Sequence, residues 1–390
     1  MIKGVYYEVK KVLHNKVFLG LMFVFLCVNC YRISQLGAHD PAISEGEARL
    51  YQELKGELTD EKIGFVVDNY VRYKGIIEEG TYSREENTED TYTGYIHGDY
   101  IMFLKLFTEW KELYEYRYYC RDIVQRASEN VLFFEDKDNT FDVKNNQAIM
   151  EKYGGRKIQN YYHKDAIERY LEYDFSSVFI ILLILLISTE LIFVENKTKM
   201  NYVIDCSSYG RARLLGTKLV FLLFITTLLS LLFYASDLAF FHLFYEMEGL
   251  SDPLFSIMAY KNTPVDWSII GYQIVAVAIK IIGFQFFTVL TFGFSYLFLN
   301  QIYTVIFSAS SFVLFVFVCE NTRWVFNPVL LLVNHNLFSG YHVVNIFNQP
   351  VSLIVVYVAV VVLALLGMLL FLFLKNRRTS ISERLMKKGM

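Results

Sequence analysis

Long apolar runs alternate with polar segments along this chain. Two of these runs, residues 175–194 and 219–241, flank a polar segment at 195–218. A bilayer core of roughly 30 Å is spanned by about twenty apolar residues in a helix, at about 1.5 Å of rise per residue. Each run is therefore long enough to cross a membrane, and the polar segment between them must lie wholly on one side of it.

The same pattern over the whole chain predicts an all-α polytopic membrane protein with six transmembrane helices. The first sixteen residues place apolar side chains at helical spacing with Lys between them, which is typical of a helix lying in the membrane interface. The predicted segments are the interfacial helix 1–16; spans 17–33, 175–195, 218–245, 268–299, 303–319 and 351–374; a large outer helical domain 34–174; an inner loop 196–217; outer loops 246–267 and 320–350; and a tail 375–390.

Charge assigns the sides of the membrane. The segment 195–218 has only two acidic residues, Glu195 and Asp205, against five basic ones: Lys197, Lys199, Arg211, Arg213 and Lys218. Basic segments are retained on the cytoplasmic side, and both ends of the chain are basic too. Residues 34–174 hold 29 Asp and Glu against 18 Lys and Arg, a net of −11. We therefore expect a cell-membrane protein with both termini cytoplasmic and residues 34–174 outside.

Composition narrows the function classes. Hydrophobic residues make up 54% of the 390, and no basic domain of the kind that nucleic-acid binding needs is present. The run 17–28 resembles the apolar part of a signal peptide, but no small-residue cleavage site follows it, which favours an uncleaved first span. Cys120 is the only cysteine within 34–174, so no intrachain disulfide is expected there.

The outer segment has the apolar content to fold. Residues 59–79 and 95–130 predict two helices, the first starting at Thr59. The apolar seam of the second helix comprises Ile101, Leu104, Phe107, Trp110, Leu113, Tyr116 and Cys120. Such a seam can line a groove for a hydrophobic ligand, but the core of a helical bundle accounts for it more simply.

Catalytic chemistry is not indicated. The stretch 210–218, GRARLLGTK, has some likeness to a phosphate-binding loop, but the glycine spacing and the Thr-Lys order are wrong and no strand precedes it. The seven His show no metal-ligand spacing. We expect no enzyme activity, metal or cofactor in this chain, so any ATP would be bound by another polypeptide.

The inner segment carries a resemblance to a known family. Counting from Glu195, Arg211 lies sixteen residues on and Lys218 twenty-three, with Ser207 and Ser208 just before the Arg. This order is similar to the cytoplasmic loop of type 2 ATP-binding-cassette (ABC) exporter permeases, which also begin with an interfacial elbow helix. The sequence departs from the family pattern at Lys199, where Gly is usual, and at 209–210, where Tyr-Gly replaces a common Pro.

The resemblance implies a bacterial permease subunit that works with cytoplasmic ABC ATPase subunits and a second permease copy or a homologous permease. ATP and Mg²⁺ would then be bound by the ATPase. The helix 201–209 would couple the two proteins through an apolar knob with charges at its rim. The implied coupling residues are Glu195, Tyr202, Val203, Ile204, Asp205, Ser207, Ser208, Arg211 and Lys218. The simpler alternative, a loop that is basic only because it lies inside, explains the charges but not their spacing.

Three function hypotheses follow. The favoured one is export of a peptide, antibiotic or other amphiphile by ATP-driven alternating access, and the related alternative is an ion-extruding ABC permease. A receptor or sensor that works through the outer domain is the second class. A secondary transporter, the third, predicts internal repeats and broken helices, which we do not detect in the sequence.

Charged and strongly polar residues inside spans are functional candidates because they are costly there. Asp237, Lys280 and Gln285 are the intramembrane candidates for a substrate path. Counted from the inner ends of their helices, Asp237 and Lys280 reach similar depth near the outer edge of the bilayer, at about 28 and 30 Å. We expect them to approach each other with Gln285 below. The alternative is that each extends separately to the outer interface.

Overall fold

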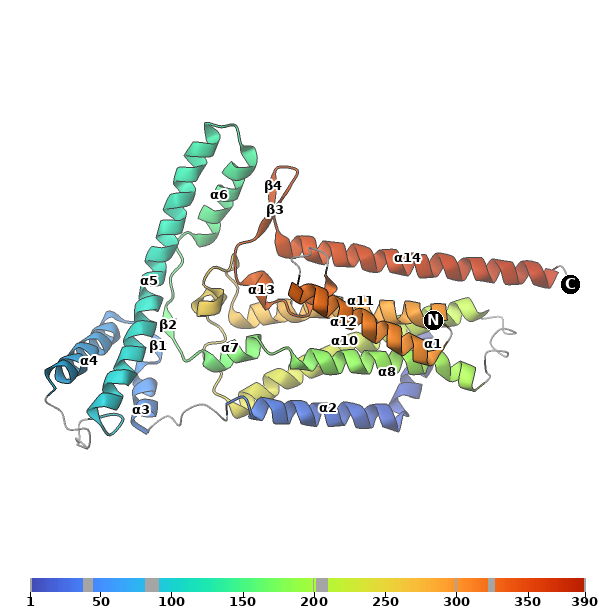
Figure 1. The fold of residues 1–390 in the computed structure, drawn as a ribbon, viewed down its shortest axis with the longest axis horizontal. Helices are drawn as coiled ribbons and strands as arrows, with labels where there is room; N and C mark the ends of the chain where they lie inside the picture. The colour runs from blue at the N-terminus through green and yellow to red at the C-terminus, as the bar shows by residue number, and fades with distance from the viewer. Residues whose placement is uncertain are drawn as a thin grey trace.

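The computed structural model describes residues 2–37, 45–80, 91–198, 200, 210–298, 300–321 and 327–388. Six of its helices are long and apolar enough to cross a membrane, which confirms a helical, multi-pass architecture. The spanning segments are Lys16–Ser34, Asp165–Glu195, Arg213–Phe244, Ile269–Phe298, Gln301–Val318 and Leu353–Lys375. In Figure 1 they run side by side along the long axis, with both chain ends at the same end of the bundle.

The long helices of these spans are α2 (Lys16–Ser34), α8 (Phe175–Lys197), α10 (Gly210–Phe244), α11 (Ile269–Phe298), α12 (Gln301–Asn321) and α14 (Leu353–Lys388), and the short helix α7 (Asp165–Leu171) precedes α8. Two boundaries differ from the prediction. Residues 210–217 were assigned to the inner loop but belong to α10, and the tail continues α14 to Lys388. Both extensions add a stretch with many polar residues to the end of an apolar helix. Hydropathy alone does not distinguish such a stretch from a loop.

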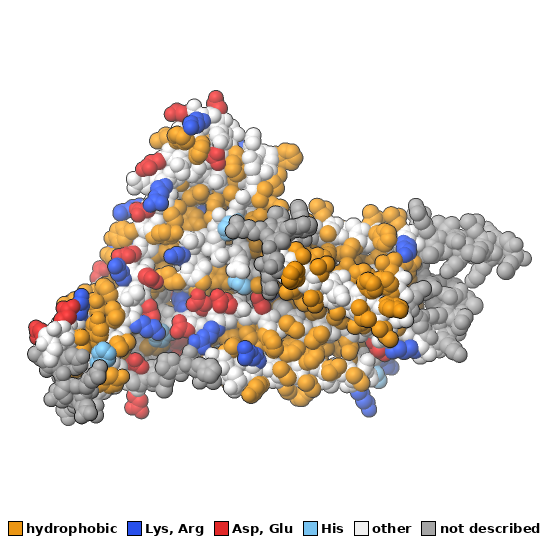
Figure 2. Space-filling view, in the orientation of Figure 1, with side chains coloured by type: hydrophobic (Ala, Val, Ile, Leu, Met, Phe, Trp, Pro, Cys, Tyr) orange, Lys and Arg blue, Asp and Glu red, His pale blue; other side chains and the backbone are white. Residues whose placement is uncertain are grey.

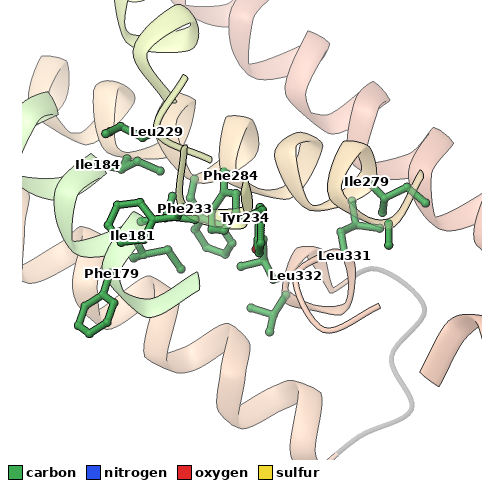
Figure 3. Close-up of a cluster of buried hydrophobic side chains, with 14 of the residues drawn as sticks. Phe179, Ile181, Ile184, Leu229, Phe233, Tyr234, Ile279, Phe284, Leu331 and Leu332 are labelled. Carbon is green, nitrogen blue, oxygen red and sulfur yellow. The ribbon is translucent and has the colours of Figure 1, made fainter. Parts of the chain in front are cut away.

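Burial divides the bundle into centre and periphery. In the apolar 18-residue stretches of spans two and four, 61% and 56% of the residues are buried, against 11% in those of spans five and six. Figure 3 shows the centre, where Phe179 of α8, Phe233 of α10 and Phe284 of α11 meet. Leu331 and Leu332, from the short helix η3 (Pro328–Leu331) and the residue after it, close this cluster. The peripheral helices α12 and α14 present broad apolar faces outward.

The segment between the first two spans folds as a helical unit. It contains α3 (Glu45–Leu54), α4 (Asp60–Glu79), α5 (Ile96–Glu135), α6 (Thr140–Tyr153) and α7 (Asp165–Leu171), with a two-stranded antiparallel sheet of β1 (Gly56–Glu57) and β2 (Asn160–Tyr161). The two predicted helices correspond to α4 and α5. The Thr59 hydroxyl caps α4 by accepting from the Lys62 N–H, and Gly80 ends it with a φ of 63°.

The seam of α5 is a packed core. Trp110 is 3% exposed and lies with Phe103, Val66 and Leu50 in one cluster. The prediction was wrong for Ile101, which is 53% exposed, because the helix turns Phe103 rather than Ile101 toward α4. The bundle-core interpretation therefore accounts for this seam.

The outer unit is joined to the bundle by the loop between α10 and α11. Arg156 donates to the Thr263 carbonyl at 2.7 Å and pairs with Asp266 at 2.5 Å. Tyr116 and Tyr153 donate their hydroxyls to the carbonyls of residues 261 and 262. Aromatic hydroxyls, the Arg156 guanidinium and backbone carbonyls thus form most of this joint.

The segment after α12 was predicted as plain loop but contains regular structure. Besides η3 it has α13 (His335–Phe338) and a hairpin of β3 (Val343–Ile346) and β4 (Gln349–Ser352), with Val344 opposite Val351. Phe347 and Asn348 form its two-residue turn with φ values of 50° and 57°. Two central residues with positive φ are typical of a type I′ hairpin turn. Phe347 is 97% exposed.

Side-chain types are segregated along the molecule. Figure 2 shows hydrophobic side chains covering the spans, while acidic and basic side chains concentrate on α3–α6 and at the junction with the bundle. The helix α1 (Ile2–Leu13) packs against α10 at the opposite end of the bundle, where the chain termini lie. The placement of α1 in the interface and of residues 34–174 outside the cell remain predictions from charge.

Labelling of single cysteines by a membrane-impermeant thiol reagent tests this orientation. Cys120 is only 2% exposed and is unsuitable as a probe, so Ser128→Cys on the exposed face of α5 and Met200→Cys in the inner loop are compared in a cysteine-free chain. We expect Ser128→Cys to react in intact cells and Met200→Cys only after permeabilisation. The reverse pattern would show that the orientation is inverted.

Candidate functional site

A buried ion pair joins the two ends of the inner loop. Lys218 of α10 is 1% exposed, and its Nζ lies 2.8 Å from Oε2 of Glu195 on α8. The same ammonium donates to the Leu191 carbonyl at 2.7 Å. A Lys buried this deeply needs a counter-charge and hydrogen-bond acceptors, and both come from the last turns of α8.

Helix α1 completes this cluster, which we call the inner clasp (Glu8, Lys11, Glu195 and Lys218). Lys11 lies 3.0 Å from Glu8 and 3.8 Å from Glu195, linking α1 to the α8–α10 pair. Glu8 is 3% exposed. A half-open pocket of about 240 Å³ lies beside the clasp, between the α1–α2 corner and the inner end of α8. The clasp therefore fixes α1, α8 and α10 together where the inner loop leaves the bundle.

The central part of the predicted coupling segment, residues 201–209, lies outside the described residues. Tyr202, Val203, Ile204, Asp205, Ser207 and Ser208 belong to it, and the side chain of Arg211 is likewise outside the description. Of the predicted coupling residues, the structure therefore places two side chains, Glu195 and Lys218, and brings them into contact.

A second polar cluster lies near the outer ends of the spans. Asp237 of α10 is 2% exposed, and its Oδ1 accepts hydrogen bonds from Asn29 Nδ2 at 2.5 Å and Ser176 Oγ at 2.7 Å. The Asn29 Oδ1 accepts from the Tyr173 hydroxyl at 2.7 Å and lies 3.1 Å from Ser176 Oγ. These four residues, from three spans, form what we call the outer oxygen cluster.

Asp237 and Lys280 were expected to approach each other, and the structure gives each of them a different partner among the described residues. Lys280 of α11 makes its ion pair with Asp174, at 2.5 Å, and the other carboxylate oxygen of Asp174 lies 3.7 Å from Nδ1 of His335. Depth along a helix was predicted correctly enough to place both residues near the outer end, but depth does not specify which way a side chain points. Asp174 lies just before α8, outside the predicted span 175–195, and so was not among the intramembrane candidates.

Gln285 stabilises helix packing. Its Nε2 donates to the Leu223 carbonyl at 2.8 Å and to the Thr227 hydroxyl at 2.7 Å, both on α10. One turn further along α11, Thr288 contacts Thr226 at 2.9 Å. Hydrogen bonds of side-chain hydroxyl and amide groups hold transmembrane helices together, because lipid provides no hydrophobic driving force for helix association. Gln285 thus connects α11 with α10, and among the described residues its hydrogen bonds go to α10 rather than to the outer oxygen cluster.

A third polar group lies at the base of the outer unit, where β2 and α7 meet the loop after α10. Lys164 pairs with Asp252 at 2.9 Å, and Lys55 pairs with Glu248 at 2.7 Å. Burial lowers the pKa of Lys164, and the Asp252 carboxylate opposes that effect. These pairs join segments far apart in the sequence, which explains why the sequence did not predict them.

Comparison with known proteins gives no match: no protein-family model, no curated protein and no solved structure matches this chain. The fold defines a multi-pass helical membrane protein.

Removing one partner of the inner clasp should destabilise the protein. Lys218→Met leaves Glu195 without its buried counter-charge, and breaking such a pair costs about 3–5 kcal/mol. We expect a clearly lower thermal midpoint for the purified chain in detergent. Lys197→Met is the matched control, because Lys197 pairs with Glu190 at 3.7 Å on an exposed face, where a pair contributes about 0–1 kcal/mol. Equal midpoints for the two variants would contradict the role of the clasp.

Proposed function

We propose that this chain is the membrane permease subunit of an ABC exporter. It moves a peptide, antibiotic or other amphiphile outward by alternating access, and cytoplasmic ABC ATPase subunits bind and hydrolyse the ATP. The chain itself contributes no catalytic residue. A second copy of the chain, or a homologous permease, completes the pathway across the membrane.

The observation that carries this proposal is the inner clasp. Any force applied to the loop 196–217 reaches the bundle through its two ends, and the ion pair of Glu195 with Lys218 ties those ends to each other. Lys11 adds α1 to the same point. A docked ATPase that moves this loop would therefore move α1, α8 and α10 together, which is what coupling to nucleotide binding requires.

The packing of the spans supports a partner within the membrane. Spans five and six bury few of their residues in the bundle, and exposed side chains such as Phe317 of α12 and Phe373 of α14 are large and apolar. Such apolar faces can pack against lipid or against a second permease subunit. The proposal assigns part of them to the second subunit, because one six-helix bundle with a packed centre leaves its transport pathway to be formed between copies.

Ion extrusion is the second candidate function. The outer oxygen cluster favours it, because Asp237 and its polar neighbours lie inside the apolar bundle rather than on its surface.

Substitutions in the inner loop test the coupling to an ATPase. Tyr202→Asp and Ile204→Asp place charges in the apolar knob of the proposed coupling helix, and burying an unpaired charge at an interface is strongly unfavourable. We expect the chain purified from its native host to lose most of its co-purifying ATP hydrolysis activity while its membrane insertion is unchanged.

The matched controls are Tyr303→Asp and Ile302→Asp, which make the same changes at exposed positions of the other inner turn, at the start of α12. These controls should retain the co-purifying activity. Wild-type ATPase recovery with both Tyr202→Asp and Ile204→Asp would rule out the coupling proposal.

A further inference from the structure

The outer oxygen cluster has more close oxygen–oxygen contacts than hydroxyl hydrogens to bridge them. Ser176 Oγ lies 2.7 Å from Asp237 Oδ1 and 3.1 Å from Asn29 Oδ1. A serine hydroxyl carries one hydrogen, so it can donate to only one of these two acceptors at a time. The Tyr173 hydroxyl already donates its hydrogen to Asn29. One close oxygen–oxygen contact is therefore left without a hydrogen between the two atoms.

The carboxylate of Asp237 is also incompletely satisfied. Its Oδ1 accepts two hydrogen bonds, but its Oδ2 is fully buried and has no hydrogen-bond partner among the described residues. Lys280, the nearby buried cation, makes its ion pair with Asp174. A buried carboxylate oxygen without a donor or counter-charge is costly, and it is the feature that a bound cation would remove.

The chain beside the cluster is not a continuous helix. Helix α7 ends at Leu171 and α8 begins at Phe175, and Tyr173 lies in the connection between them. Asp237 lies seven residues before the end of α10, so about 10 Å below its outer end. Tyr173 itself is half-buried.

We propose that Asp237, Asn29, Ser176 and Tyr173 form a binding site for Na⁺. The oxygens of a carboxylate, an amide and two hydroxyls are the ligands that hard cations prefer, whereas the described residues hold no group of three or more His, Cys, Asp and Glu that would suit a transition metal. Na⁺ supplies the positive counter-charge that Oδ2 of Asp237 lacks. It also offsets the repulsion between the oxygens of Ser176, Asn29 and Asp237, which have one serine hydrogen to share. A proton on Oδ2 would neutralise the charge but would add a donor without an acceptor.

The site gives the ion-extruding form of the proposed function a specific cation, and in a peptide exporter it would make the bundle sensitive to Na⁺. Its test uses this chain alone, so the site and the ATPase coupling can fail separately. If Na⁺ binds but the inner-loop variants keep their ATPase, the site stands and the exporter proposal falls.

The experiment measures the thermal midpoint of the purified full-length chain at pH 8 while NaCl replaces N-methylglucamine chloride at constant ionic strength. A ligand that binds the folded state raises the midpoint in a saturable way. We expect such a rise for the wild-type chain and none for Asp237→Asn, which keeps the size of the side chain but loses its charge. Ser176→Ala, which keeps the charge, should weaken the apparent Na⁺ affinity by about tenfold or more.

Ser188→Ala is the matched control, since Ser188 is a fully buried serine on the same helix, twelve residues further toward the inner end. It should respond to Na⁺ as the wild-type chain does. Three results overturn the proposal: no Na⁺ response in the wild-type chain, an undiminished response in Ser176→Ala and Asp237→Asn, or a midpoint that follows pH but not Na⁺. If Asp237→Asn does not fold, the comparison of Ser176→Ala with Ser188→Ala decides.

Discussion

A bilayer core supplies no water to polar groups, so a polar side chain inside the spans is costly unless the protein supplies its partner. The inner clasp and the α10–α11 bonds of Gln285 meet this constraint with partners from neighbouring helices, whereas the outer oxygen cluster leaves Oδ2 of Asp237 without a donor among the described residues. Lys218 obtains a counter-charge and a carbonyl acceptor from α8, and Lys280 obtains Asp174. Because apolar contacts distinguish poorly between protein and lipid, these polar contacts determine which helices remain neighbours.

Outside the spans water competes for polar groups, and packing has a larger part in stability. The outer unit is held by the aromatic core around Phe103 and Trp110 and is joined to the bundle by Tyr116, Tyr153 and Arg156. Asp99 shows how a buried charge is accommodated there: it accepts hydrogen bonds from the N–H groups of residues 92 and 93 at the start of α5. The outer unit thus contacts the bundle mainly through one loop, the connection from α10 to α11.

The spans could be predicted from the sequence because twenty apolar residues in a row have few alternatives to a membrane helix. The neighbours of Asp237 could not be predicted from the sequence. A residue count gives height along a helix, but each added residue rotates the side chain by about 100°, and only packing sets that rotation. Asn29, Ser176 and Tyr173 were overlooked because only charged residues and one Gln were weighed as intramembrane candidates. The hairpin was missed because its turn carries Phe347 and Asn348 rather than the Gly that usually marks a type I′ turn.

Both polar clusters are built on the same pair of helices. Helices α8 and α10 are joined at the inner end by Glu195 and Lys218 and at the outer end by Ser176 with Asp237 and by Ser177 with Tyr234, 2.9 Å apart. Helix α2 is tied to this pair through Asn29, and α1 through Lys11. A unit fixed at both ends can tilt but does not readily separate. In the proposed alternating access we therefore expect α1, α2, α8 and α10 to move as one body, together with α11, which Gln285 and Thr288 bond to α10. Helices α12 and α14, which bury the fewest residues, are then the elements against which that body moves.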